Sequence, residues 1–204
     1  MPNLERPGPG GRLERSEDAG RWPDAAPGLG GRGPRRSGAH GFAGVAPGAA
    51  PTTLERMKIA VASDERTGVA DAVVDELRRR GHEPVLHGAL ADGERDDWAW
   101  ASEAAAREVA DGRAEQGIVC CWTGTGASIA ANKVDGVRAA LCGDAETARG
   151  ARKWNDANVL ALSLRSTSAP VLEEILDAWF AGTASDAAGD LENIAHLAEI
   201  ETAD

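Results

Sequence analysis

A cysteine that ends an apolar run just before a glycine-spaced turn is the feature of this 204-residue sequence best suited to chemistry. The stretch Ile118–Lys133 reads IVCCWTGTGASIAANK, with Cys121 ahead of Gly124 and Gly126. Free backbone N–H groups at a strand-to-helix turn attract an anion and so favour the thiolate form of a cysteine. A thiolate beside such a row of N–H groups can take a proton from carbon while the N–H groups hold the resulting enolate. The pattern therefore predicts a proton-abstracting site.

Other interpretations of the turn are possible, and each makes its own demands on the sequence. A dinucleotide site needs a third glycine after the first strand, whereas Gly124–Ile129 lacks that glycine and follows the third expected strand. A phosphate-binding P-loop needs Gly-Lys-Ser/Thr, and Lys133 comes too late for it. Small buried core cysteines are the plain structural interpretation, which we expect for Cys120 and Cys142. The four histidines lack metal-ligand spacing with any cysteine, so we expect no metal and no other cofactor.

The elements that must position this turn lie after a break in composition near residue 57. Residues 1–56 are rich in Gly, Pro, Ala and Arg, and they have too few large apolar side chains to offset their ordering entropy. We predict them to be a disordered extension. Met57 is a candidate initiator that would make this extension non-native. Residues 57–204 suit a single domain with a core of its own.

Apolar runs alternate with helix-period segments in that domain, which predicts a parallel sheet covered on both faces. Expected strands cover residues 58–63, 83–87, 116–121, 137–142 and 158–163. Expected helices cover residues 68–80, 97–111, 127–133, 145–153, 168–180 and 190–200. This order predicts an α/β fold, a three-layer αβα doubly wound (Rossmann-like) sheet of about five parallel strands. Ligands of such sheets bind beyond the carboxyl ends of the strands, where Cys121 and Asp64 are both expected.

Charge and cysteine content exclude some classes of partner. A net charge of −11 argues against nonspecific binding to nucleic acid or to an anionic membrane. No apolar run approaches the roughly 18 residues of a membrane span. Three cysteines, two of them adjacent, do not make a disulfide framework, so we expect a cytoplasmic protein.

The motifs at the predicted site resemble the family of ribose-5-phosphate isomerase type B and the galactose-6-phosphate isomerase subunits. In that family a strand ends in Cys-Gly-Thr-Gly-x-Gly, followed by x-Ser-Ile-Ala-Ala-Asn-Lys. This chain has Cys121-Trp-Thr-Gly-Thr-Gly126, followed by Ala-Ser-Ile-Ala-Ala-Asn-Lys133. Further matches are Gly136-Val-Arg138 and Asn155-Asp156-Ala-Asn158, and the resemblance spans about residues 57–182.

The resemblance implies an aldose–ketose isomerase that passes a proton between C2 and C1 through an enediolate without a metal. Cys121 would be the base, and Asp64 and Asn155 would contact hydroxyl groups of a sugar or sugar phosphate. The anion hole would be lined by Thr123, which we also assign to catalysis, and by Gly124, Thr125 and Gly126. The family also implies a homodimer, or a tetramer built as a dimer of dimers, with sites completed across the subunit interface.

Four departures from the family pattern concern the substrate. The histidine after Ser-Asp is Glu65, the ring-opening histidine is Trp154, and the glycine after the cysteine is Trp122. We assign all three to substrate binding, with the two tryptophans as a stacking wall or, equally well, as packing residues. Ser185–Glu192 lacks the family's two phosphate-gripping arginines, each worth about 1.5–3 kcal/mol. The expected substrate is therefore not ribose 5-phosphate itself. The alternative is a noncatalytic relative that binds a sugar or metabolite, or a partner subunit of a hetero-oligomeric isomerase.

Overall fold

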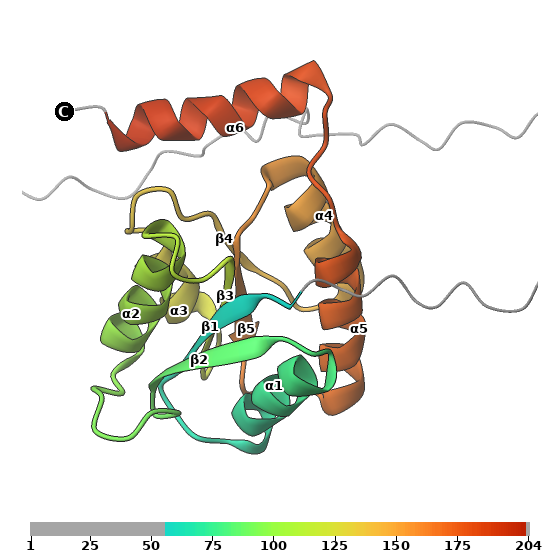
Figure 1. Ribbon diagram of the computed structural model, residues 1–204. Coiled ribbons are helices and arrows are strands. Elements are labelled where there is room, and N and C mark those ends of the chain that lie inside the picture. The colour runs from blue at the N-terminus through green and yellow to red at the C-terminus, as the bar shows by residue number, and fades with distance from the viewer. Residues whose placement is uncertain (1–55, 203–204) are drawn as a thin grey trace, which may run out of the picture. The chain divides into compact units, whose positions relative to one another are not determined.

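Five parallel strands form one sheet in the order β2-β1-β3-β5-β4 (Figure 1). The computed structural model describes residues 56–202, so the prediction for residues 1–56 lies, apart from Arg56, outside the described residues. The strands are β1 (Lys58–Ser63), β2 (Glu83–Gly88), β3 (Gln116–Cys121), β4 (Ala139–Leu141) and β5 (Val159–Ser163). The helices are α1 (Gly68–Arg79), α2 (Trp98–Ala110), α3 (Thr125–Ala131), α4 (Ala145–Asn155), α5 (Ala169–Ala181) and α6 (Ala188–Glu201).

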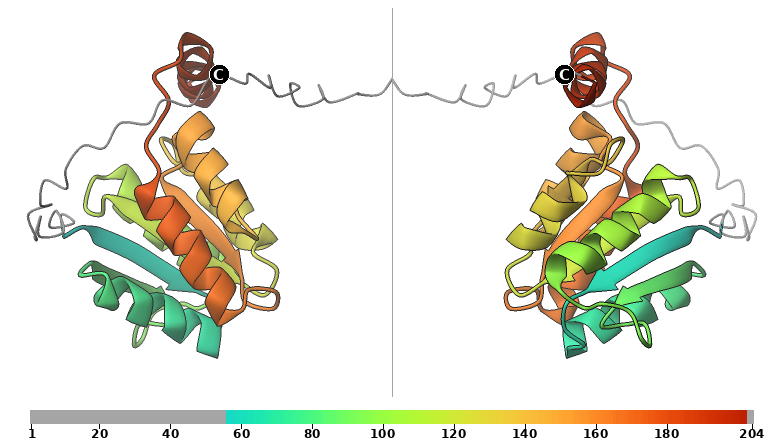
Figure 2. Two further views of the ribbon diagram at one scale, coloured as in Figure 1. Left: turned by 90° about the vertical axis from the view of Figure 1, so that its right-hand side faces the viewer. Right: turned by 90° about the vertical axis from the view of Figure 1, so that its left-hand side faces the viewer.

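Helices cover both faces of the sheet, as the sequence predicts. Helices α1, α4 and α5 pack on one face and α2 and α3 on the other (Figure 2). Side chains alternate along each strand, so Ile59 and Val61 of β1 face α1 and α5, whereas Ala60 and Ala62 face α2. Both faces of the sheet are buried, and this explains why the strands read as continuous apolar runs.

The two core layers differ in the size of their side chains. The layer under α1, α4 and α5 contains large residues such as Leu77, Ile118, Leu160 and Trp179. The layer under α2 and α3 is rich in alanine, including Ala105 and several others. The turn into α3 lies near the strand ends because it directly follows β3.

The edges of the sheet and the last helix complete the described part. Strand β4 has only three residues and forms one edge of the sheet, with β2 at the other. Helix α6 has no buried residue and contacts α4. Within residues 56–202, none of the helices is both long and apolar enough to cross a membrane.

Candidate active site

The candidate active site lies at the carboxyl ends of β1 and β3, where the order of the sheet reverses. From β1 the chain moves outward to β2, and from β3 it moves to the opposite side of the sheet. A doubly wound sheet opens a crevice at this point, and ligands bind there. Ser63 pairs with Cys120 in the parallel register, so Asp64 and Cys121 follow as neighbours on the face covered by α2 and α3. The structure therefore brings together two of the predicted site residues.

The thiol of Cys121 is held by the turn that follows it. The side chain is 5% exposed, and the backbone N–H of Ala127 donates a hydrogen bond to Sγ over 3.4 Å. Gly124 donates its own N–H to the carbonyl of Cys121 and has a φ of 75°. A side chain on Gly124 would place its Cβ 2.5 Å from Leu141 Cδ1 and 2.9 Å from the carbonyl carbon of Leu162. Only glycine fits this position, and the turn that it allows brings the N–H of Ala127 to the sulfur.

Asp64 follows β1 next to the end of β3, and its carboxyl group lies in an environment that disfavours its charge. Its Oδ1 atom is buried and has no hydrogen-bond partner within the described range. Burial raises the pKa of Asp64, the neighbouring charge of Glu65 raises it further, and backbone N–H groups partly oppose both effects. A buried oxygen without a partner is suited to accept a hydrogen bond from a ligand hydroxyl.

The remaining turn residues form the rim of the site. The hydroxyl groups of Thr123 and Thr125 are 2.7 Å apart and are exposed. The ring of Trp98, the first residue of α2, lies against Gly126, where an added Cβ would be 3.0 Å from its Cε3. Trp98 is thus a wall beside the turn that is not among the site residues predicted from the sequence. Its signal was an aromatic residue at the start of the helix that covers this face.

Trp122 lies on the other side of the sheet from Cys121. Its side chain is 54% exposed and lines a hollow formed by α1, α5 and their preceding loops. Successive residues of a strand point to opposite faces, and this alternation carries past the end of β3. Within one chain the structure therefore does not bring the Trp122 ring beside Cys121, and the assignment of Trp122 to a stacking wall or to packing stays a prediction. Glu65 is exposed at the same strand ends.

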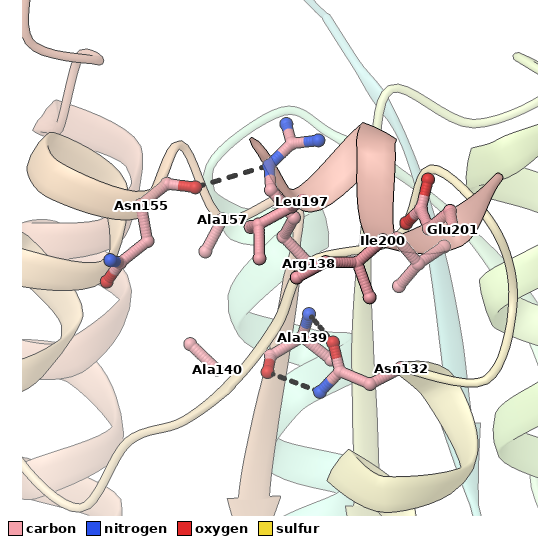
Figure 3. A pocket seen from close by; sticks show the side chains of 10 residues that line it. Asn132, Arg138, Ala139, Ala140, Asn155, Ala157, Leu197, Ile200 and Glu201 are labelled. Carbon is pink, nitrogen blue, oxygen red and sulfur yellow. Dashed lines mark hydrogen bonds between the residues drawn. The ribbon is translucent and has the colours of Figure 1, made fainter. Parts of the chain in front are cut away.

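Trp154 and Asn155 lie at the opposite edge of the sheet. They end α4, a helix of 11 residues that starts after the carboxyl end of β4 and leads back toward the start of β5. The backbone carbonyl of Asn155 accepts a hydrogen bond from Nε of Arg138, the residue just before β4 (Figure 3). The length of α4, about 16 Å at 1.5 Å per residue, separates this end from the carboxyl edge. One chain therefore does not bring Trp154 or Asn155 to Cys121.

A cavity of about 460 Å³ opens beside Asn155, between the edge strand β4 and α6 (Figure 3). Leu197 and Ile200 of α6 contribute its apolar side. Asn132 holds the strand at its floor, because its side-chain amide both donates to the carbonyl and accepts from the N–H of Ala139. The asparagine of the sequence motif thus completes the edge of the sheet.

The other two cysteines are core residues, as predicted. Burial raises the pKa of Cys120 to about 12, with smaller contributions from the neighbouring Cys121 and Asp64. Burial also raises the pKa of Cys142 to about 12, followed by an effect of Asp144. Neither thiol therefore forms a thiolate at neutral pH to a useful extent.

Comparison with known proteins agrees with this geometry. Residues 59–197 match the family model described as Ribose/Galactose Isomerase. The galactose-6-phosphate isomerase subunit LacB of Clostridium acetobutylicum is 40% identical over 105 residues, which are 52% of this chain and 60% of that subunit. The match to LacB thus spans less than two thirds of that relative's length.

Two further matches cover more of the proteins concerned. The D-erythrulose-4-phosphate isomerase of Pectobacterium atrosepticum is 34% identical over 60% of this chain and 82% of its own length. The solved structure of the type B ribose 5-phosphate isomerase of Trypanosoma brucei superposes with a TM-score of 0.66 and 37% identity. It covers 72% of this chain and 99% of the other.

Proposed function

This chain belongs to the ribose/galactose isomerase family of sugar-phosphate isomerases, and from this premise we propose that it interconverts an aldose and a ketose with Cys121 as the base. The observation that supports this best is the position of Cys121 Sγ. It lies 3.4 Å from the donating N–H of Ala127, next to the half-buried carboxyl group of Asp64. A base, a set of oxyanion donors and a hydroxyl acceptor are thus neighbours at a crevice where ligands of this fold bind.

The proposed chemistry follows from these three groups. The Cys121 thiolate takes the proton from C2 of the open-chain aldose, and the C–H electrons form the C1–C2 double bond of an enediolate. The negative charge on O1 meets the backbone N–H groups of Thr125 and Gly126 and the hydroxyl of Thr123. Asp64 accepts a hydrogen bond from a sugar hydroxyl. The thiol then returns the proton to C1, while the O2 proton passes to O1 and the C2 carbonyl forms.

The proposed substrate is a sugar other than ribose 5-phosphate. Asp64 and Glu65 place two carboxyl groups at the site, and the segment Ser185–Glu192 has no arginine. The loss of two arginine–phosphate bonds weakens binding by about 3–6 kcal/mol, which is two to four decades in affinity. A substrate that is already open-chain, such as a tetrose or triose derivative, also avoids the need for the ring-opening histidine that Trp154 replaces.

We propose that a second copy of the chain completes the site. Trp154 and Asn155 cannot reach Cys121 within one chain, yet they stand in a motif that the family shares. Helix α6 also presents an apolar series at i, i+3, i+4 and i+7, namely Leu191, Ile194, Ala195 and Ala198, and none of its residues is buried. A homodimer that covers this series and brings the end of α4 to the partner's turn accounts for both observations.

Proton exchange followed by NMR tests the proposed reaction directly. The full chain and its Cys121→Ala variant are incubated in D2O with aldoses, ketoses and their phosphates of three to six carbons. Deuterium is expected at C1 or C2 of one class of sugar, only when Cys121 is present. Cys142→Ala removes a thiol of the core at another position and is expected to leave exchange intact, so it serves as the matched control.

A negative result favours the second candidate function. If no sugar exchanges, or if Cys121→Ala exchanges like the unmodified protein, the chain is better described as a noncatalytic sugar-binding relative or a partner subunit. The observation that supports this second candidate function is the similarity to LacB, a subunit of a galactose-6-phosphate isomerase. Protection of the Cys121 thiol by a sugar, without exchange, would separate a binding relative from an inert subunit.

A further inference from the structure

A hollow of about 360 Å³ lies beside Trp122, on the face of the sheet opposite to Cys121. We name it the Trp122 hollow. Small-molecule sites typically occupy about 300–1,000 Å³, so its size suits one small ring or a short branched chain. Its lining consists of Thr67, Gly68, Val69, Ala72, Trp122, Leu164, Thr167, Ser168, Ala169 and Leu172.

The wall of the Trp122 hollow is apolar and preformed. Leu164 and Leu172 are almost fully buried, and they give the hollow a fixed floor. The carbonyl of Trp122 accepts hydrogen bonds from the N–H of Arg165 over 3.1 Å and from Ser163 Oγ over 3.0 Å. These bonds hold the backbone of Trp122, so its half-exposed ring stands at the mouth without any rearrangement.

Two helices of 12 and 13 residues, α1 and α5, begin at this hollow. Their first internal hydrogen bonds run from Asp71 N–H to the Thr67 carbonyl and from Leu172 N–H to the Ser168 carbonyl. The N–H groups of Gly68 and Val69 in α1 have no partner in the helix, whereas Ala70 donates to the Thr67 hydroxyl. In α5 the free N–H groups are those of Ala169 and Val171, since Pro170 has none. Each helix end carries about half a positive charge, and the two together amount to about one.

The hydroxyl of Thr167 is an independent sign of a ligand. Thr167 lines the hollow and is 7% exposed, yet its side-chain oxygen makes no hydrogen bond to any described residue. The Thr167 oxygen is not itself buried, so within this otherwise buried residue it is open to the hollow and available to a ligand there. The Ser168 side chain, at the adjacent N-cap of α5, likewise makes no capping bond.

We infer that the Trp122 hollow is a second ligand site, which takes a small molecule with an apolar body and one carboxylate. The apolar body stacks on Trp122 and fills the space over Leu172, while the carboxylate meets the two helix ends and the Thr167 hydroxyl. No lysine or arginine lines the hollow. About one positive charge from the helix ends matches a single carboxylate better than a doubly charged phosphate.

Titration of the full chain with benzoate, followed by NMR of the indole N–H groups, tests this site. We expect a saturable shift of the Trp122 resonance and none of the Trp154 resonance, since Trp154 is equally exposed but remote. Benzyl alcohol has the same ring without the charge and should bind about 3- to 30-fold more weakly. Thr167→Val keeps the shape and removes the hydroxyl, so it should weaken benzoate about 2- to 10-fold.

A variant that fills the hollow completes the test. Ala72→Leu should abolish the saturable benzoate shift at Trp122. Equal shifts at Trp122 and Trp154, equal binding of benzyl alcohol, or full affinity in Ala72→Leu would each overturn the inference. If sedimentation shows that Ala72→Leu changes the assembly state and benzoate does not bind, the hollow is a subunit contact and the inference fails. These readouts need no turnover, so they are independent of the proposed isomerase activity.

Discussion

The three cysteines of this chain occupy two kinds of environment, and only one of the cysteines is placed for chemistry. Cys120 and Cys142 are surrounded by core residues, whereas Cys121 lies at the carboxyl end of the central strand β3, where the turn supplies an N–H donor. Chemical reactivity therefore separates the three thiols without knowledge of the substrate.

Alkylation by iodoacetamide should modify Cys121 alone. A pKa of about 12 leaves Cys120 and Cys142 with roughly one thiolate in 100,000 at neutral pH, and the thiolate is the reactive form. Mass spectrometry of peptides from the folded protein should therefore find the label on Cys121. Cys121→Ala should lose nearly all labelling, and Cys142→Ala should label like the unmodified protein. Persistent label in Cys121→Ala would show that a core thiol is accessible.

Asp64 is held in a state that opposes folding but suits a ligand. Its folded pKa is raised above the ordinary 3.8, so between these two values the folded state binds more protons than the unfolded state. Its contribution to stability is therefore present at low pH and is lost as the pH rises through the folded pKa. Asp64→Asn should raise the midpoint of thermal unfolding at neutral pH and abolish isomerisation.

The sign of this effect is checked by its pH dependence. The stability gain of Asp64→Asn over the unmodified protein should grow as the pH rises from the ordinary aspartate pKa of 3.8 toward neutrality. Asp92→Asn, a change at an exposed carboxyl group, should show no such trend. A gain that shrinks with rising pH would mean that Asp64 is stabilised as a carboxylate.

At the scale of elements, the sequence predicted the buried strands best. Residues 58–63 and 116–121 are β1 and β3 as expected, because a continuous apolar run is what a strand covered on both faces requires. Strand β4 was expected over 137–142 but pairs only over Ala139–Leu141, because it has a neighbour on one side only. Helix α3 was expected from residue 127 and begins at Thr125, because the positive φ of Gly124 lets the helix start directly after the turn.

The short edge strand β4 depends on Asn132. Asn132→Ala removes both hydrogen bonds to Ala139, and we expect the free energy of unfolding to fall by about 1–2 kcal/mol. Urea denaturation measures this loss, and amide exchange of Ala139 should accelerate because its N–H loses its acceptor. Asn132→Asp keeps that acceptor but not the donor, so it should leave Ala139 better protected than Asn132→Ala. Unchanged exchange in both variants would assign the edge to other contacts.

At the scale of the whole molecule, the sequence predicts the fold and the residues of the turn after β3. It predicts less well which other residues lie beside that turn. Asp64 and Cys121 each follow a predicted strand, and they were expected to lie close together because the carboxyl ends of parallel strands lie on the same side of the sheet. The positions of Trp122 and Trp154 depend on which face a loop residue takes and on the direction of α4, and local periodicity does not encode either. Asn155 shows this difference best. Its sequence motif resembles the same family as the turn after β3, but within one chain Asn155 lies far from that turn.

Mixed dimers test whether two chains share each site. If Cys121 of one chain works with Asn155 of its partner, Cys121→Ala and Asn155→Ala are each inactive alone. A mixed dimer then has one site carrying both changes and one site carrying neither. Random pairing at equal expression makes half the dimers mixed, so activity should return to about one quarter of the unmodified level. Two differently tagged chains purified in sequence should approach one half. No recovery in purified mixed dimers would place Asn155 outside the site and return it to the edge of β4.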